Sequence, residues 1–274
     1  MKQRRYAVPY LVWMAMFIVV PLLIVLYYGL TVQGADGSFV FSLENIQKAF
    51  TPAYMKVLWR SIWMAGVATI LCLLIGYPTA KILASRDFKK GSIVLILIII
   101  PMWMNFLLRT YAWINLLNDN GLIQQILHAV GIQDAKLLYN TGAVIVGLVY
   151  NFLPFMILPI YSVMVKIEPH LIEAAEDLGA NNRTVFRRVI WPLSMPGVVS
   201  GVVMCFMPAV TTFAVSRLLG GSMFMMYGDL IENQFYFMRD WHFGATLSIV
   251  MMALVLLSML FFRRKGAKEG GLLF

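Results

Sequence analysis

Six long apolar stretches constrain what this chain can fold into. They lie at about residues 8–30, 58–85, 92–117, 142–166, 193–216 and 243–263. A helix needs about 20 predominantly apolar residues to cross a bilayer, so each stretch is long enough to span a membrane. Because backbone polar groups have no water partner inside a bilayer, each span must satisfy its own hydrogen bonds, which favours helices. The sequence therefore predicts an all-α integral membrane protein with six transmembrane helices in a single domain over residues 1–274.

The composition agrees with a membrane protein and argues against nucleic-acid binding. Hydrophobic residues make up 61% of the chain and charged residues only 13%, whereas soluble domains carry about 25% charged residues. The net charge of +9 has the sign that nucleic acid attracts. However, the basic residues stand at the ends of the apolar stretches instead of forming one patch. We therefore expect lipid, and no nucleic acid, among the partners of this chain.

The distribution of basic residues predicts the orientation in the membrane. Most of the 22 Lys and Arg residues fall in residues 1–7, 86–90, 166–188 and the tail from residue 263. Cytoplasmic segments of membrane proteins carry the excess of Lys and Arg. Both termini and the polar loop at 168–192 are thus expected in the cytoplasm. The first apolar stretch is too long for a signal peptide and lacks a small-residue cleavage site, so we expect an uncleaved span.

The polar loop at residues 168–192 carries a readable helix pattern. Pro169 favours the first turn of a helix, because its missing N–H is not needed there. Gly179 can end that helix, since glycine adopts the left-handed conformation without steric cost. Between them, the small side chains of Ala174 and Ala175 would allow another protein to approach closely. The loop is also compatible with a plain solvated connection between two spans.

A second helix is predicted in the same loop. Asn181 or Asn182 can cap it, because an asparagine side chain accepts hydrogen bonds from free N–H groups in the first turn. The helix is expected to begin near Thr184 and to stop at Pro192. The loop as a whole is thus predicted to be a helix, a glycine turn and a second helix.

The stretch EAAEDLGANNRTVFRRVIWP resembles the EAA signature of ABC importer permeases. Two hydrophobic residues, Val189 and Trp191, replace the Ile and Leu of that signature. In the family, this segment is the coupling helix, which docks into a groove on a cytoplasmic ATPase. The resemblance implies a type I ABC importer permease fold. It also implies a role in ATPase coupling for the matching residues Glu173, Ala174, Ala175, Gly179 and Pro192.

Three further stretches resemble the spermidine/putrescine importer permeases. They are IPMWMNFLLRTYAW at 100–113, GLVYNFLPFMILPIY at 147–161 and RDWHFGA at 239–245. The resemblance implies a bacterial inner-membrane subunit that pairs with a second related permease, two copies of an ABC ATPase and an extracytoplasmic polyamine-binding protein. ATP and Mg would be bound by the ATPase, and no cofactor by this chain. The chain contains no G-x-x-x-x-G-K-[ST] phosphate loop.

A polyamine path should offer aromatic faces and oxygen acceptors to a cation. Lipid packing or an interfacial belt is the more common role of such aromatic residues in a membrane protein. The two acidic candidates stand three residues apart, so a helix would place them on one face, where they attract a cation, contact the binding protein or form an ordinary exposed pair. The candidates are Trp103, Asn105, Tyr111, Tyr150, Asn151, Asp229 and Glu232.

Other charged or metal-binding residue types give weaker signals. Arg109 does not suit a cation path, and we expect it to form a structural salt bridge or to contact the partner permease. Cys72 and Cys205 fall inside apolar stretches and are interpreted as small buried hydrophobic residues. The three histidines lack the spacing of metal ligands, so no metal site is expected.

Two other classes of function fit the sequence less well. A secondary transporter would be expected to carry mid-membrane carboxylates or inverted repeats. A membrane enzyme would need a catalytic motif such as H-E-x-x-H or G-x-S-x-G, and the sequence has neither. The sequence thus predicts a non-catalytic transmembrane subunit of an ATP-driven polyamine importer. A permease for another small solute is the alternative.

Overall fold

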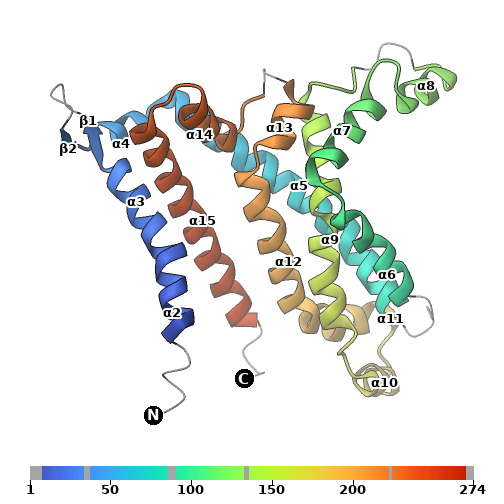
Figure 1. Ribbon diagram of the computed structural model, residues 1–274. Coiled ribbons are helices and arrows are strands. Elements are labelled where there is room, and N and C mark those ends of the chain that lie inside the picture. The colour runs from blue at the N-terminus through green and yellow to red at the C-terminus, as the bar shows by residue number, and fades with distance from the viewer. Residues whose placement is uncertain (1–7, 34–37, 86–90, 133–135, 222–223, 270–274) are drawn as a thin grey trace. The chain divides into compact units, whose positions relative to one another are not determined.

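A computed structural model describes residues 8–33, 38–85, 91–132, 136–221 and 224–269 (Figure 1). The chain divides into two compact units. The first comprises Met1–Trp59 and Tyr227–Leu256, and the second comprises Arg60–Met226 and Leu257–Phe274. In the described residues, five helices are long and apolar enough to cross a membrane, and a bent helix pair makes a sixth if it counts as one span.

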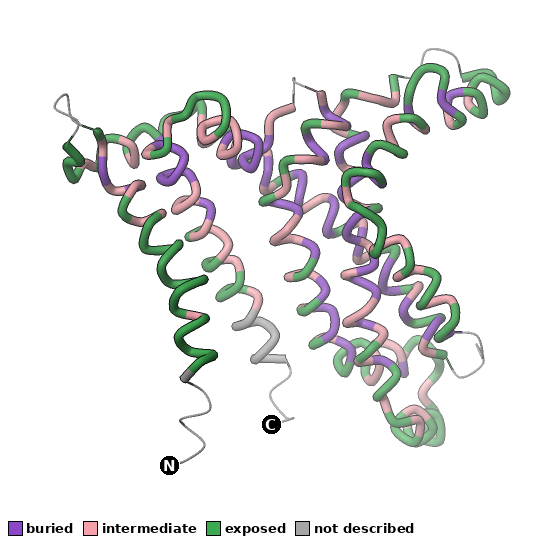
Figure 2. Tube along the Cα trace, viewed as in Figure 1, coloured by how far each residue is buried: buried purple, intermediate pink, exposed green. Residues whose placement is uncertain are grey.

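The first unit is built on an apolar N-terminal helix. It consists of α2 (Val8–Met14), a π turn η1 (Ala15–Val19) and α3 (Val20–Gly29). None of the residues in its most apolar window is buried within the chain, and Figure 2 draws most of this helix as exposed. Such a surface in a membrane protein faces lipid or another subunit. This helix therefore agrees with the predicted span at 8–30.

Short elements follow this helix in the first unit. The strands β1 (Thr31–Gln33) and β2 (Phe39–Phe41) pair antiparallel, which the sequence did not predict. The helix α4 (Glu44–Ala49) follows, and Ser42 Oγ accepts a hydrogen bond from the Glu44 N–H at 3.1 Å. The unit is completed by α14 (Tyr227–Tyr236) and by most of α15 (Trp241–Glu269).

Hydrogen bonds join α3 to α15 within the first unit. Thr246 Oγ1 donates to the Gly29 carbonyl at 2.9 Å. The ring of His242 places Nδ1 3.1 Å from the Tyr28 carbonyl and 3.2 Å from Thr31 Oγ1. A side chain at Gly29 would collide with Ile249, so the two helices approach closely because this residue is glycine.

The core of the second unit consists of three helices, α5 (Pro52–Ala84), α9 (Thr141–Met164) and α12 (Trp191–Thr211). Small residues let them approach closely, as is common between membrane helices. A Cβ on Gly197 would lie 2.8 Å from the Pro159 carbonyl oxygen, and a Cβ on Gly76 or Gly201 would lie 3.0 or 2.7 Å from side-chain atoms of Met156. Met156 is fully buried, and the buried residues of this core appear as purple segments in Figure 2.

The two cysteines lie in this core, as predicted. Cys72 and Cys205 are both buried. Their thiols approach carbonyls of the same helix, α9: Cys205 Sγ is 3.1 Å from the Phe152 oxygen and Cys72 Sγ is 3.7 Å from the Val149 oxygen. Each cysteine therefore acts as a small packing residue that is also a weak donor.

The region predicted as one span at 92–117 is bent. The helices α6 (Gly91–Ile99) and η2 (Ile100–Trp103) form its first part, and α7 (Phe106–Leu117) continues into α8 (Leu122–Ala129). The two parts meet at 95°. A new helix, α7, begins directly after Asn105. The Asn105 Oδ1 accepts a hydrogen bond from the Leu107 N–H at 2.8 Å and so caps the start of α7.

The predicted span at 193–216 also has different limits. A continuous helical segment runs over Asn182–Thr211, and a separate helix, α13 (Ala214–Leu219), follows. The helix therefore begins inside the polar loop and ends earlier than expected. In Figure 1, α13 lies at one end of α9 and α12, whereas α10 (Pro169–Asp177) and α11 (Asn182–Val185) lie at the other end.

Candidate functional site

The segment 168–192 begins with the predicted helix and glycine turn. Glu168 precedes α10 in an extended conformation, and Pro169 occupies the first helical position. At the other end, the Gly179 N–H donates to the Glu176 carbonyl at 2.8 Å, and the Ala180 N–H donates to the Ala175 carbonyl at 3.0 Å. Gly179 has φ +80°. This pair of bonds is a Schellman motif, which requires the left-handed conformation that glycine adopts without strain.

The second helix of the segment is capped by Asn181. Its Oδ1 accepts hydrogen bonds from the N–H and the hydroxyl of Thr184, both at 2.9 Å. The prediction that Pro192 stops this helix is wrong. A π turn, η3 (Phe186–Ile190), lies just upstream, and the α-helical pattern restarts at Trp191. Pro192 therefore stands in a first turn, where a missing N–H is tolerated, and the helix continues.

Helix α10 has an inner and an outer face. It contacts α11 and η3, with Ile172 and Ala175 only partly exposed. Ala174 is exposed, so the two alanines do not share one outer face as expected. Leu171 and Leu178 flank Ala174 at helical spacing and expose 41% and 89% of their surfaces. We call Leu171, Ala174 and Leu178 the outer stripe.

Glu173 is exposed beside the outer stripe. It stands in the middle of α10, since Pro169 is the first residue of that helix. A role in capping the start of α10 is therefore excluded, because capping acts on the first-turn N–H groups. What remains is a carboxylate that points toward solvent, in reach of a basic group on another protein.

The two helices of the segment carry opposite charges. The exposed acidic residues of α10 are Glu173, Glu176 and Asp177. On the second helix, three arginines and Thr184 line an open pocket of about 180 Å³. The lining arginines are Arg183, Arg187 and Arg188. The segment thus presents an acidic and a basic surface next to each other, with the outer stripe on the acidic helix.

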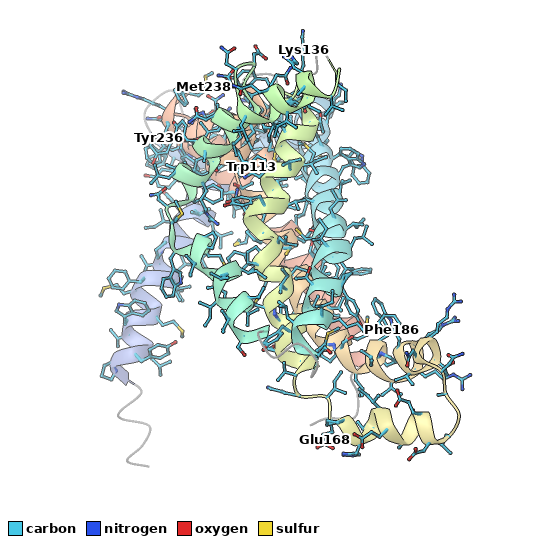
Figure 3. The ribbon with its side chains drawn as sticks, turned by 90° about the vertical axis from the view of Figure 1, so that its right-hand side faces the viewer. Trp113, Lys136, Glu168, Phe186, Tyr236 and Met238 are labelled. Carbon is cyan, nitrogen blue, oxygen red and sulfur yellow. The ribbon has the colours of Figure 1, made fainter. Side chains whose placement is uncertain are left out.

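A cluster that the sequence did not predict attaches this segment to α5. Phe186 and Trp191 contact Tyr77, and Lys81 lies over the Phe186 ring. Figure 3 labels Phe186 in the second helix of the segment and Glu168, which directly precedes α10. The only sequence signal was the spacing of four between Tyr77 and Lys81, which places them on one face of a helix.

Comparison with known proteins decides the family. The sequence model of the family described as "Binding-protein-dependent transport system inner membrane component" matches residues 72–265, which include the whole segment 168–192. This chain belongs to that family. It is therefore an inner-membrane permease component, a non-catalytic membrane subunit that crosses the membrane several times.

Several curated relatives of this permease are named for polyamine transport. The spermidine/putrescine transport system permease protein PotB of Haemophilus influenzae is 40% identical over 251 residues, covering 89% of this chain and 88% of the relative. PotB of Escherichia coli is 39% identical over 253 residues, covering 89% and 92%. The inner membrane ABC transporter permease protein YdcU of Escherichia coli is 29% identical over 240 residues, covering 82% and 76%.

Solved structures show the fold of the permease. A chain of a bacterial ABC transporter that imports the acidic polysaccharide alginate aligns with a TM-score of 0.77 at 15% identity, covering 97% of this chain and 95% of that one. A chain of the MetNI methionine ABC transporter aligns with a TM-score of 0.58 at 18% identity, covering 78% and 95%. The permease thus has the type I ABC importer fold.

The candidate path residues of the permease fall in both compact units. Trp103 is 85% exposed beside the break between η2 and α7, and Tyr111 is exposed on α7. Tyr150 of α9 meets Trp113 of α7 with ring centroids 5.4 Å apart, and Trp113 is labelled in Figure 3. Asn105 serves as the cap of α7. These four candidates lie in the second unit, on the surfaces of α7, α9 and the break.

Asn151 is the candidate with the most restricted environment. Its residue is 1% exposed, and its Nδ2 donates to the Gly147 carbonyl at 2.9 Å. Its Oδ1 has no hydrogen-bond partner among the described residues. A buried carbonyl oxygen without a partner is costly, so this atom is suited to accept a hydrogen bond from a ligand or from water.

The acidic candidates lie on α14 of the first unit. The predicted shared helix face is present, because α14 includes both Asp229 and Glu232. Asp229 is buried and Glu232 is partly exposed, so the pair is not an ordinary exposed one. Burial also raises the pKa of the neighbouring Tyr227 phenol above its usual range, which keeps that group neutral.

Arg109 is buried on α7. Its guanidinium carbon lies 5.9 Å from the centroid of the Phe106 ring, and its Nε has no hydrogen-bond partner among the described residues. The salt bridge considered for this residue is not formed with any described carboxylate. The expectation of a contact with a partner permease stays a prediction.

Proposed function

We propose that this permease is the transmembrane subunit of an ATP-driven importer for polyamines such as spermidine and putrescine. The observation that carries the proposal is the similarity to spermidine/putrescine permeases, which extends over most of the length of both chains. The alternative, a permease for another small solute, has no comparable support. The two compact units act together as one transmembrane domain that forms half of the translocation pathway.

The segment 168–192 is the coupling segment in this proposal. Its outer stripe inserts into a groove of a cytoplasmic ATPase, where Ala174 leaves room between Leu171 and Leu178. Glu173 pairs with a basic group of the ATPase, and Gly179 sets the sharp turn at the tip. Pro192 lies in the first turn of α12 and does not end the helix, so its part in coupling is to help define where α12 begins. The ATPase binds ATP and Mg, whereas this chain binds neither.

The remaining partners follow from the exposed apolar surfaces and the family. The helix from Val8 to Gly29 buries nothing in its most apolar window, which suits lipid or a second, related permease. Two ATPase copies each receive one coupling segment, and an extracytoplasmic binding protein delivers the polyamine. The excess of Lys and Arg near both termini and the coupling segment supports a cytoplasmic location for all three. ATP binding moves the coupling segments, and this motion turns the spans from inward-facing to outward-facing.

The polyamine path uses weak contacts. Asn151 Oδ1 accepts a hydrogen bond from an ammonium group, because it is buried and has no described partner. Trp103, Tyr111 and Tyr150 offer aromatic faces, each contributing about 0.5–2 kcal/mol to cation binding. Asn105 supplies a further oxygen near the helix break. Two carboxylates attract the cation on the extracytoplasmic side or contact the binding protein, and they are Asp229 and Glu232.

Purification and uptake experiments test the proposal. The tagged chain, extracted in mild detergent, should bring down an ATPase and a second permease. In proteoliposomes with ATP and binding protein, it should take up labelled spermidine, and excess putrescine should compete where an unrelated amino acid does not. Gly179→Asp adds a side chain and a charge at the exposed turn, so the ATPase alone should be lost. Purification without an ATPase, or uptake that polyamines do not block, would contradict the proposal.

A further inference from the structure

Five residues from three helical elements meet at one end of the second unit. Tyr77 and Lys81 come from α5, Phe186 from η3, and Trp191 and Ser194 from α12. The Tyr77 ring lies 6.0 Å from the Phe186 ring and 5.1 Å from the Trp191 ring, centroid to centroid. Lys81 Nζ lies 4.5 Å from the centroid of the Phe186 ring. We call these five residues the aromatic clasp.

The polar groups of the clasp have defined donor roles. Ser194 Oγ lies 2.9 Å from the Trp191 carbonyl and 2.9 Å from the Tyr77 hydroxyl. A serine hydroxyl has one hydrogen, and the carbonyl can only accept, so Ser194 donates to Trp191 and Tyr77 donates to Ser194. Tyr77 is 7% exposed and Ser194 is fully buried. Each of these two hydroxyls therefore has its hydrogen-bond partner inside the clasp.

The clasp holds α5 against the coupling segment, and packing holds α9 against α12. The helical segment Asn182–Thr211 is continuous from the coupling segment into α12. A Cβ on Gly197 would be 3.0 Å from Ile160 Cα, so α9 packs on α12 at backbone distance. Phe186 belongs to the coupling segment itself and touches α5 through Tyr77 and Lys81. The coupling segment therefore contacts α5 directly, and it continues into α12, which packs against α9. A displacement of α10 and α11 can reach all three helices by this route.

We propose that the aromatic clasp transmits the movement of the coupling segment to α5, so that α5, α9 and α12 move as one body. The proposal rests on the function proposed above, and it names positioning residues that touch neither substrate nor ATP. Rings and a cation–π contact suit this task, because they hold two helices at a fixed distance through large, well-packed surfaces. A hydrophobic side chain without a ring keeps the burial but loses that geometry.

The main test compares Phe186→Leu with Phe155→Leu in the reconstituted complex. Phe155, on α9, is partly exposed like Phe186, and the ring contact described for it is with Phe152 of its own helix. Polyamine uptake per ATP hydrolysed should fall between about twofold and about thirtyfold in Phe186→Leu, the range seen when residues between two coupled sites are altered. ATPase co-purification checks separately that docking, which the proposed function assigns to the outer stripe, is intact in both variants. Phe155→Leu should leave the ratio unchanged.

A second pair of variants isolates the cation. Lys81→Gln removes the charge over the Phe186 ring, whereas Lys81→Arg keeps a cation that stacks on aromatic faces. Uptake per ATP should fall in Lys81→Gln and recover in Lys81→Arg. Lys81 is exposed, so both Lys81 variants should fold even if Phe186→Leu does not. Equal uptake ratios in the two variants and the wild type would overturn the role of the cation.

Distance measurements decide the proposal independently of transport. Spin labels at Ile82→Cys on α5 and Ser200→Cys on α12 would occupy exposed positions. With the clasp intact, the distance between them should stay the same with and without ATP, and in Phe186→Leu its distribution should broaden. A label distance that changes with ATP in the intact complex, or unchanged uptake per ATP in Phe186→Leu, would overturn the clasp. A wild-type complex without ATPase or polyamine uptake would instead overturn the proposed function, and the label distances would still test the clasp.

Discussion

Asn181 Oδ1 accepts two hydrogen bonds from Thr184, one from its N–H and one from its hydroxyl, each at 2.9 Å. This cap fixes where the helix after the Gly179 turn begins. Replacing Asn181 by Ala leaves those first-turn donors to water, and we expect local stability to fall by about 1 kcal/mol. Hydrogen exchange of amides 182–186 should accelerate accordingly, while α9 amides keep their wild-type rates.

Asn181→Asp is the matched control, because an aspartate oxygen caps a helix as well as an asparagine oxygen. It should keep wild-type exchange rates in the same amides. Faster exchange in Asn181→Asp as well as in Asn181→Ala would mean that the side-chain NH₂ group of Asn181, and not its oxygen, stabilises the start of this helix.

Gly179 is expected to tolerate Asn better than Ala. A Cβ at this position meets nothing within 4 Å, so space does not limit the substitution. The cost comes from φ +80°, which disfavours Ala by about 1–2 kcal/mol and Asn by less, because Asn visits this region more readily. Exchange of the Ala180 amide, which bonds to the Ala175 carbonyl, should accelerate more in Gly179→Ala. Faster exchange in Gly179→Asn than in Gly179→Ala would show that side-chain contacts, and not the backbone conformation, determine the cost of the substitution.

Gly197→Ala should destabilise the second unit. The new Cβ would lie 2.8 Å from the Pro159 oxygen and 3.0 Å from Ile160 Cα. Both are backbone atoms that cannot turn away, so the helices must separate at a cost of about 1–3 kcal/mol. Thermal unfolding in detergent should show a lower midpoint. Gly66→Ala is the control, since nothing lies within 4 Å of its Cβ, and an equal loss there would contradict the close-approach explanation.

Leu178→Ser should weaken binding of the ATPase. Leu178 is 89% exposed at the end of α10, so its replacement leaves the core of this permease intact. A buried anchor in an interface contributes at least about 1.4 kcal/mol, or a tenfold change in Kd. Titration of purified ATPase against the permease complex measures the change. Val130→Ser, at a position 73% exposed on the segment after α8, should not alter that Kd.

Local signals predicted the structure of the segment 168–192 well. Pro169 at the start, Gly179 in the turn and Asn181 at the cap each act through one or two bonds with near neighbours, and those bonds are present. The same reasoning failed at Pro192. A proline usually ends a helix, but the π turn before it changed the hydrogen-bond register, and nothing in the sequence indicates a π turn.

Features that depend on distant residues were not accessible from the sequence. The cap that Asn105 forms on α7 is a local bond, but the 95° bend at that point was not predicted. The hairpin of β1 and β2 and the burial of Asp229 depend on packing within the first unit. The clasp joins residues such as Tyr77 and Phe186, which are far apart in the chain, so only the folded structure brings them together.

The unbroken helix from Asn182 to Thr211 has a consequence for how this protein can vary. Each residue of an α-helix turns it by about 100° and advances it by about 1.5 Å. One residue inserted between Trp191 and Gly197 would rotate the Phe186 ring away from Tyr77 while Gly197 stayed against Ile160. Apart from Ser194, which the clasp uses, side chains in between can change more freely than the number of residues can. The number of residues in this stretch therefore fixes the angle between two contact surfaces of one helix, the surface that meets Tyr77 and the surface that meets Ile160.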